Sequence, residues 1–206
     1  MTTSKELETA LIDVRRAYRL LHAYHRRLCD LLEIVDERLA KTGFEFDRWQ
    51  PHHAALPAKA SKRFFASDRW AWDLAPSYQL QCEWIATSTK LTRRVVIIAV
   101  ADTGFDDSCD GEPDPEHFGQ VEGATSELGL GLWTADSQKP AWGAAWERFE
   151  RLPNAHDGRE HAVVADGTRY TRKYQTLGLS MLDSESAVKE RLLGPVAEWA
   201  SASAAR

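Results

Sequence analysis

One group of residues that could hold a metal ion lies in an acidic segment, residues 102–125. Five of them match positions 1, 3, 5, 6 and 9 of an EF-hand-like calcium loop: Asp106, Ser108, Asp110, Gly111 and Asp114. His117 stands at position 12, where such a loop supplies a bidentate glutamate. We therefore interpret the segment as a solvated acidic loop. Its aspartates are candidate ligands only, and no metal is assigned.

Two further residues with metal-binding chemistry follow predicted strands. Asp102 ends the second predicted strand, and Asp136 follows the third, two residues before Gln138. This placement and the element order α-β-β-β-α-β over residues 4–166 resemble the restriction-endonuclease-like core, where a carboxylate and a (D/E)-x-K motif bind a divalent metal. The resemblance implies a metal-dependent nuclease or phosphodiesterase. The sequence departs from the motif at Gln138, where the lysine should stand, since Lys139 is one residue too far along.

No other catalytic pattern stands out. The sequence contains no Gly-x-Ser-x-Gly elbow and no glycine-rich phosphate loop. The three cysteines (Cys29, Cys82 and Cys109) are widely spaced, which predicts free thiols in a reducing compartment. The motifs therefore favour a non-catalytic protein without a cofactor, and a divalent metal is expected only under the nuclease alternative.

Basic residues form one ridge on the first predicted helix. Arg15, Arg19, His22 and Arg26 follow one another at helical spacing, and no acidic residue lies between Asp13 and Asp30. Guanidinium groups bind carboxylates and phosphates well, so the ridge is a candidate surface for an acidic protein or a nucleic acid. The simpler interpretation is a solvated face. The net charge of −5 argues against non-specific binding of DNA.

Aromatic residues supply a second candidate binding surface. Trp70 and Trp72 belong to a set of eight tryptophans, a residue type enriched in cores and at binding hot spots. We expect most of the eight to lie in the core. Trp70 and Trp72 could form a recognition surface, although a plug that closes one end of the core is the favoured interpretation.

The strongest structural pattern is the first forty residues, which predict one long amphipathic helix at 4–42 with Gly43 as its C-terminal cap. Ten positions step by alternating fours and threes along one stripe: Leu7, Leu11, Val14, Tyr18, Leu21, His25, Leu28, Leu32, Val35 and Leu39. Ala10, Ala17, Tyr24 and Leu31 broaden the stripe along one flank. The pattern fits either a dimer seam or, as we favour, the spine of the domain.

The remaining elements predict a single α+β domain over residues 1–206. Residues 44–76 lose any periodicity and are interpreted as an irregular, aromatic-rich segment. Strand patterns within 78–182 predict a largely antiparallel sheet of four or five strands, with an inserted helix at 140–151. A last amphipathic helix spans 185–200. We expect the long N-terminal helix and two further helices to pack on the sheet.

Three local patterns refine this sheet. A polar turn at 88–90 connects the first two predicted strands, and Asp166-Gly167 is a strong hairpin signal. In the third predicted strand, Gly129 and Gly131 alternate with leucines. Glycines on one face of a strand allow a ligand or another backbone to approach closely, or mark a bulge.

Composition sets the remaining limits. Hydrophobic residues at 43% and charged residues at 28% are typical of a soluble globular protein. The longest uninterrupted apolar run, residues 95–101, is too short to cross a bilayer. We therefore expect a cytoplasmic protein that acts through protein–protein contact, as an accessory or regulatory subunit. Its partner is another protein or a second copy of the chain, bound through the first helix.

Overall fold

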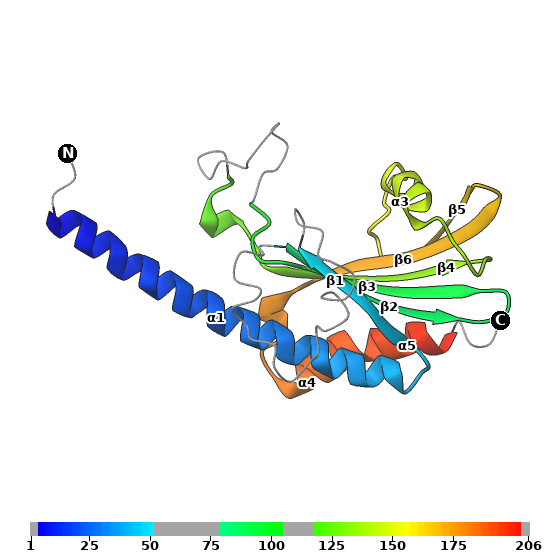
Figure 1. Ribbon diagram of the computed structural model, residues 1–206, viewed down its shortest axis with the longest axis horizontal. Coiled ribbons are helices and arrows are strands. Elements are labelled where there is room, and N and C mark those ends of the chain that lie inside the picture. The colour runs from blue at the N-terminus through cyan, green and yellow to red at the C-terminus, as the bar shows by residue number, and fades with distance from the viewer. Residues whose placement is uncertain (1–3, 52–78, 105–117, 203–206) are drawn as a thin grey trace.

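The structure is a computed structural model that describes residues 4–51, 79–104 and 118–202. A six-stranded sheet forms its centre, and one long helix extends beyond the sheet at one end (Figure 1). The helix, α1 (Ser4–Ala40), confirms the predicted continuous element. Gly43 has a φ of +80°, and the amides of Gly43 and Phe44 donate to the carbonyls of Ala40 and Leu39. This is a Schellman cap, which glycine favours because it adopts a left-handed conformation without a steric penalty.

Every neighbouring pair of strands in the sheet is antiparallel, and the spatial order is β1-β2-β3-β4-β6-β5. The strands are β1 (Glu45–Pro51), β2 (Gln79–Thr87), β3 (Thr92–Val100), β4 (Glu127–Ala135), β5 (Glu160–Ala165) and β6 (Thr168–Gly178). The predicted α+β class is confirmed. The sheet has six strands where four or five were expected.

The additional strand, β1, lies in residues 44–76, which the sequence predicts to be irregular; that prediction is wrong for residues 45–51. Its register with β2 shifts between Phe46 and Arg48, which is the mark of a β-bulge. The bulge places Phe46 and Trp49 on the same face although they are three residues apart, so the sequence shows no alternation. Phe46 packs edge-to-face on Trp84, with 5.5 Å between the ring centroids.

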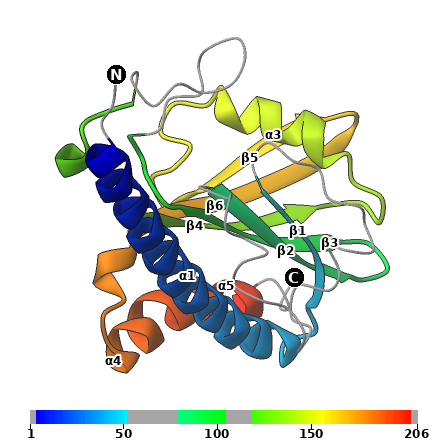
Figure 2. The ribbon, with the colours of Figure 1, turned by 60° about the vertical axis from the view of Figure 1, so that its left-hand side comes forward.

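Helices cover both faces of the sheet (Figure 2). The α1 face, which carries Cys82, Ile97 and Leu130, packs against α1 and the C-terminal helical segment. That segment comprises α4 (Glu185–Ala187), the π-helix η5 (Val188–Leu193) and α5 (Gly194–Ala202). Its π-helical turn precedes Pro195, whose ring would clash with the carbonyl of a regular α-helical turn.

The opposite face, the α3 face, is covered in part by α3 (Trp142–Glu150). This helix confirms the predicted inserted helix, and its Ala145 and Phe149 are buried. Trp133 of β4 stacks on Trp146 at 5.3 Å and meets the edge of Phe149 at 5.2 Å. Aromatic packing therefore holds this side of the sheet, whereas the α1 face is mainly aliphatic.

The two glycines of β4 make room for a tyrosine on this α3 face. A Cβ atom at Gly129 would lie 1.8 Å from the Tyr174 hydroxyl oxygen, and one at Gly131 would lie 3.1 Å from the same ring. The close approach that the glycines predict is therefore made by a side chain of the neighbouring strand β6. Burial raises the pKa of Tyr174 to about 12, since the phenolate loses its hydration in this position.

Two short 3-10 helices complete the described part of the chain: η3 (Val121–Gly123) before β4 and η4 (Leu179–Met181) after β6. Ser184 accepts a hydrogen bond from the Ala187 amide and so caps the last helical segment. Val188, Leu192 and Val196 are buried, as the amphipathic pattern predicts.

Candidate protein-interaction site

The apolar stripe of α1 divides into two halves with different surroundings. From His25 to Leu39 its members are buried, with at most 2% of each side chain exposed. Leu11, Val14, Tyr18 and Leu21 belong to the same stripe and are 38–51% exposed. Figure 1 shows the reason, because the first half of α1 extends past the edge of the sheet. We call the four exposed residues the α1 tip.

The boundary between the halves lies at Tyr24 and His25. His25 is the first stripe residue that is excluded from solvent, and the rings of Tyr24 and His25 meet edge-to-face at 5.1 Å. Burial raises the pKa of Tyr24 to about 12. Beyond this point the C-terminal half of α1 joins the core cluster, and the Trp84 indole donates a hydrogen bond of 2.7 Å to Asp36.

The structure places the predicted basic ridge beside the α1 tip. Arg15, Arg19 and Arg26 are exposed, and Arg26 forms an ion pair of 3.5 Å with Asp30. On an α-helix these residues lie within about 100° of the stripe on one flank, and Ala10 and Ala17 border its other flank. A partner that covered the α1 tip would therefore meet guanidinium groups on one side and small side chains on the other.

The structure does not bring the nuclease candidates together. Asp102 follows β3 beside the start of β4, and Asp136 follows the far end of β4. The nine paired residues between them span roughly 30 Å, so the two carboxylates cannot bind one ion. The strand β1 also precedes the three strands of the expected element order, which departs from the nuclease-like succession.

The local contacts of these residues are those of turns. The Asp102 carboxylate accepts a hydrogen bond of 2.8 Å from the Gly104 amide. Gln138 donates to the Thr89 carbonyl at 2.8 Å and so joins two loops. Within the described residues no group of three or more His, Cys, Asp or Glu side chains could hold a metal ion. Asp106, Asp110, Asp114, Trp70 and Trp72 lie outside the described residues.

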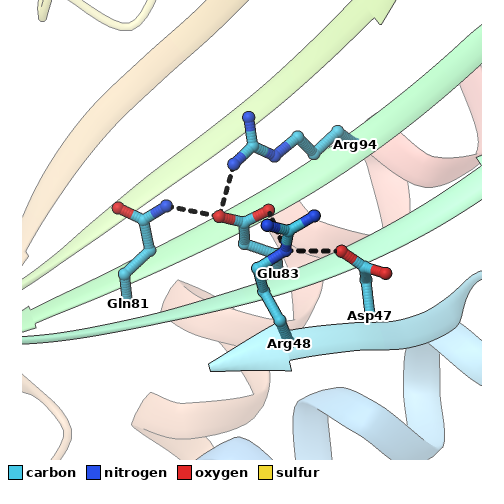
Figure 3. A network of polar contacts seen from close by, with 5 residues as sticks. All are labelled: Asp47, Arg48, Gln81, Glu83 and Arg94. Atoms are coloured by element: carbon cyan, nitrogen blue, oxygen red, sulfur yellow. Dashed lines mark hydrogen bonds and ion pairs between the residues drawn. The ribbon is translucent and has the colours of Figure 1, made fainter. Parts of the chain in front are cut away.

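A buried charged network lies on the α3 face, and no sequence pattern predicts it (Figure 3). Glu83 of β2 is 2% exposed and forms an ion pair with Arg94 of β3. Its carboxylate also accepts a hydrogen bond of 2.6 Å from Gln81 and lies 3.7 Å from the Arg48 Nε. Arg48 in turn donates to Asp47 at 2.7 Å, and this bond raises the pKa of Arg48 above its usual value.

A second buried cation lies farther along the same face. Arg172 of β6 is 1% exposed and donates to the Glu150 carboxylate at 2.7 Å and to the Ala155 carbonyl at 3.2 Å. Its guanidinium carbon lies 5.0–5.5 Å from the ring centroids of Phe149, Trp133 and Tyr174. Arg172 therefore ties α3 to β6, and Arg94 of β3 pairs with Glu83 of β2 beneath the Trp142 ring, whose centroid lies 5.5 Å from the Arg94 guanidinium carbon.

One cavity of about 470 Å³ lies beside the α1 boundary. Tyr24, Leu28 and Leu31 line it from α1, and residues 124–127 and 178–180 line it from the ends of β4 and β6. Arg27 at its rim donates to the Leu182 carbonyl at 2.9 Å. The cavity is mostly apolar, and its Arg27, Thr125 and Ser126 side chains bond within the fold, so the α1 tip is the more distinctive surface.

A family model described as PM0109 matches residues 4–202, and the chain belongs to that family. The description names no activity or ligand. No curated protein and no solved structure matched the chain. In the part of the chain that the structure describes, none of the helices has the length and apolar character needed to span a membrane.

Proposed function

We propose that this protein acts through protein–protein contact and pairs with a second copy of itself through the α1 tip. The observation that carries the proposal is the change in exposure along the apolar stripe of α1. Its residues are 38–51% exposed between Leu11 and Leu21 and at most 2% exposed from His25 to Leu39. Large apolar side chains grouped on a projecting helix are typical of an interaction surface.

The size of the surface sets the strength of the association. Complete burial of a side chain such as Leu or Val contributes about 1.5–3 kcal/mol, so a half-exposed one has roughly 1 kcal/mol left to gain. Four residues on each of two copies give roughly 8 kcal/mol, against an association cost of about 4–15 kcal/mol. At the lower end of that cost about 4 kcal/mol remains, so we expect a weak, reversible dimer with a dissociation constant of about 1 mM.

Two features support a second copy of α1 as the partner. The stripe keeps the spacing of fours and threes that helix pairs use, and the small flanking residues Ala10 and Ala17 permit close approach. On the other flank, Glu8 precedes Arg15 by seven residues, and both are exposed. In an antiparallel pair centred between Leu11 and Val14, Glu8 of each copy faces Arg15 of the other.

We further propose that the protein works in the cytoplasm as a non-catalytic accessory or regulatory subunit. Cys29 and Cys82 are buried cysteines outside any disulfide, which supports a reducing compartment. The buried charged groups Glu83, Arg94 and Arg172 all take part in ion pairs, which favours a structural role for them over a catalytic one.

Sedimentation velocity over a concentration series tests the association. We expect monomer at about 10 µM and a mixture of monomer and dimer near 1 mM. Val14→Glu should raise the dissociation constant at least about tenfold, because it places a charge in the apolar contact. The matched control is Leu20→Glu, since Leu20 is 71% exposed but lies on the opposite side of the helix. A strictly monomeric wild-type chain, or equal effects of the two substitutions, would contradict the proposal.

Charge exchange tests the antiparallel arrangement. Glu8→Arg and Arg15→Glu should each weaken the dimer about threefold to tenfold, because each places like charges opposite one another. The double substitution should restore the wild-type dissociation constant. If each single substitution weakens the dimer and their combination weakens it further, the two residues do not face each other.

A further inference from the structure

A groove between α3 and β5 forms a second unpartnered surface, at the far side of the sheet from the α1 tip. Both views place α3 beside β5 at this corner of the molecule (Figures 1 and 2). The groove has a volume of about 560 Å³. Its lining comprises Ala144, Glu147, Arg148, Arg151, Leu152, Val163 and Val164.

The first component of this surface is the free edge of β5. Among the described strands, β5 pairs with β6 alone and ends the sheet. Asp166 and Gly167 both have positive φ values, so they form a two-residue turn closed by the pair Ala165 and Thr168. In an antiparallel pair, residues that bond to the neighbouring strand alternate with residues that do not. Counted from the closing pair, Ala162 and Val164 do not bond to β6, so their backbone N–H and C=O groups point away from it.

This edge carries little of the protection that exposed edges usually have. The sequence of β5 contains neither lysine nor proline, and its pairing with β6 is continuous, without a bulge. Ala162 is exposed and Val164 is 59% exposed, so solvent reaches the two residues whose backbone groups point away from β6. An added strand could therefore bond to the backbone of β5 and cover Val164.

The second component is one flank of α3. Ala144, Glu147, Arg148 and Arg151 follow one another at helical spacing and border the groove, whereas Ala145 and Phe149 face the sheet. Arg148 and Arg151 are exposed. Leu152 and Val163 add apolar surface to the lining. The flank therefore presents two guanidinium groups and one carboxylate above an apolar floor.

We propose that this groove binds an extended acidic segment of another protein, which adds to β5 as an antiparallel strand. The backbone of the segment would bond to Ala162 and Val164, as in other cases of strand addition. Alternate side chains of an added strand point to opposite faces. One set would cover Val164, and the other would lie under α3, where Arg148 and Arg151 bind carboxylates.

The charge of the groove argues against a second copy of β5 as the occupant. Antiparallel pairing of two β5 edges brings both copies of α3 to the same side of the joined sheet. Four arginines, two from each copy, would then border one interface, and among the residues that line the groove only Glu147 of each copy would offset them. An acidic segment from another protein avoids this repulsion and neutralises both guanidinium groups.

A synthetic probe tests this proposal on the full chain. The probe is a fluorescein-labelled hexapeptide in which Val and Glu alternate, and its binding is followed by fluorescence anisotropy. We expect saturable binding that weakens with added salt, and no saturable binding by a peptide in which Lys replaces Glu. Methylation of the valine amides, which face β5 in an antiparallel addition, should abolish binding. Methylation of the glutamate amides, which face away, should change the dissociation constant by less than about threefold.

Substitutions in the protein test the two components separately. Arg148→Glu with Arg151→Glu should weaken binding of the Val–Glu peptide at least about tenfold. The matched control is Lys189→Glu with Arg191→Glu, which makes the same charge change at exposed positions of η5 and should leave binding unchanged. Val164→Pro should abolish binding while the fold is kept, because the Val164 amide faces away from β6.

Three outcomes would overturn the proposal: no saturable binding of the Val–Glu peptide, equal loss with both methylated peptides, or equal loss with the control charge pair. A dimer that Val164→Pro dissociates would also overturn it, since the occupant would then be a second copy. The α1 tip is distant from this groove, so Val14→Glu should leave peptide binding unchanged. Failure of one surface is therefore distinguishable from failure of the other.

Discussion

The two halves of α1 carry one apolar pattern but meet different surroundings. From His25 to Leu39 the stripe lies on the sheet, and from Leu11 to Leu21 it lies in solvent. Helix propensity and amphipathicity cannot distinguish the halves, because both depend only on the residues of the helix itself. The difference arises from the sheet beneath, which ends before the first half begins. An apolar stripe therefore shows what a helix can bury, while the rest of the fold decides where.

The flanks of the stripe add a second difference between the halves. Beside the buried half, Cys29 and Leu31 are also buried, so the helix presents a broad apolar face to the sheet. Beside the exposed half lie Ala10, Ala17 and the basic ridge. A broad face suits packing on a sheet, and a narrow stripe between small and charged residues suits another helix. The flanks thus indicate which kind of surface each half covers.

The largest effect that would test this comparison is the loss of a buried leucine. Leu32→Ala should lower the free energy of unfolding by about 3 kcal/mol, because it leaves a cavity in the core beneath α1. Leu11→Ala removes the same atoms from the exposed half and should cost less than about 0.5 kcal/mol in the monomer. Urea unfolding at concentrations below the dimer dissociation constant measures both. Similar losses for the two variants would contradict the division of the helix.

A smaller effect concerns the hydrogen bond that fixes the buried half on the sheet. Asp36→Ala removes the acceptor of the buried Trp84 indole and should cost about 1–3 kcal/mol. Glu37→Ala is the matched control, since it removes the neighbouring carboxylate at an exposed position. Asp36→Asn keeps an oxygen acceptor and should recover most of the loss. Equal stability of the Asp36→Ala and Glu37→Ala variants would show that the bond contributes little.

Much of the fold was predictable because its signals are local. The long helix, the hairpin at Asp166-Gly167 and the glycine-containing strand β4 each follow from neighbouring residues. The strand β1 was not predictable in the same way, because its bulge disturbs the alternation that identifies a strand. A bulge is visible only when the partner strand is known. The close approach at Gly129 likewise depends on Tyr174, which belongs to a different strand.

The candidate sites depended even more on distant contacts. The turn predicted at 88–90 does not determine which residue of the next strand pairs with Thr87. A shift of one residue in that register turns every side chain of the strand to the other face of the sheet. The observed pairing of Thr87 with Thr92 puts Glu83 and Arg94 on one face. The separation of Asp102 from Asp136 follows from the antiparallel direction of β3 and β4. For the α1 tip, the sequence supplied the residues, and the length of the sheet decided which of them are exposed.

The smallest effect concerns the boundary between the two halves at Tyr24. Burial raises the pKa of this side chain to about 12, whereas a tyrosine in the unfolded chain ionises near pH 10. The unfolded state therefore loses its proton first as the pH rises. The stability contributed by the partly buried neutral phenol is complete below about pH 10 and is lost between about pH 10 and pH 12. The difference in absorbance at 295 nm between the wild type and Tyr24→Phe follows this one ionisation.

We expect that difference to titrate near pH 12 in the folded protein and near pH 10 in urea. Tyr18→Phe supplies the control from the exposed half, since it removes a phenol that is 51% exposed. Loss of the Tyr18 hydroxyl should leave the titration of Tyr24 unchanged at concentrations where the chain is monomeric. If Tyr24 instead ionises near pH 10 in the folded protein, solvent reaches its hydroxyl. The buried half of α1 would then begin farther along the helix, and the surface available for pairing would extend beyond the α1 tip.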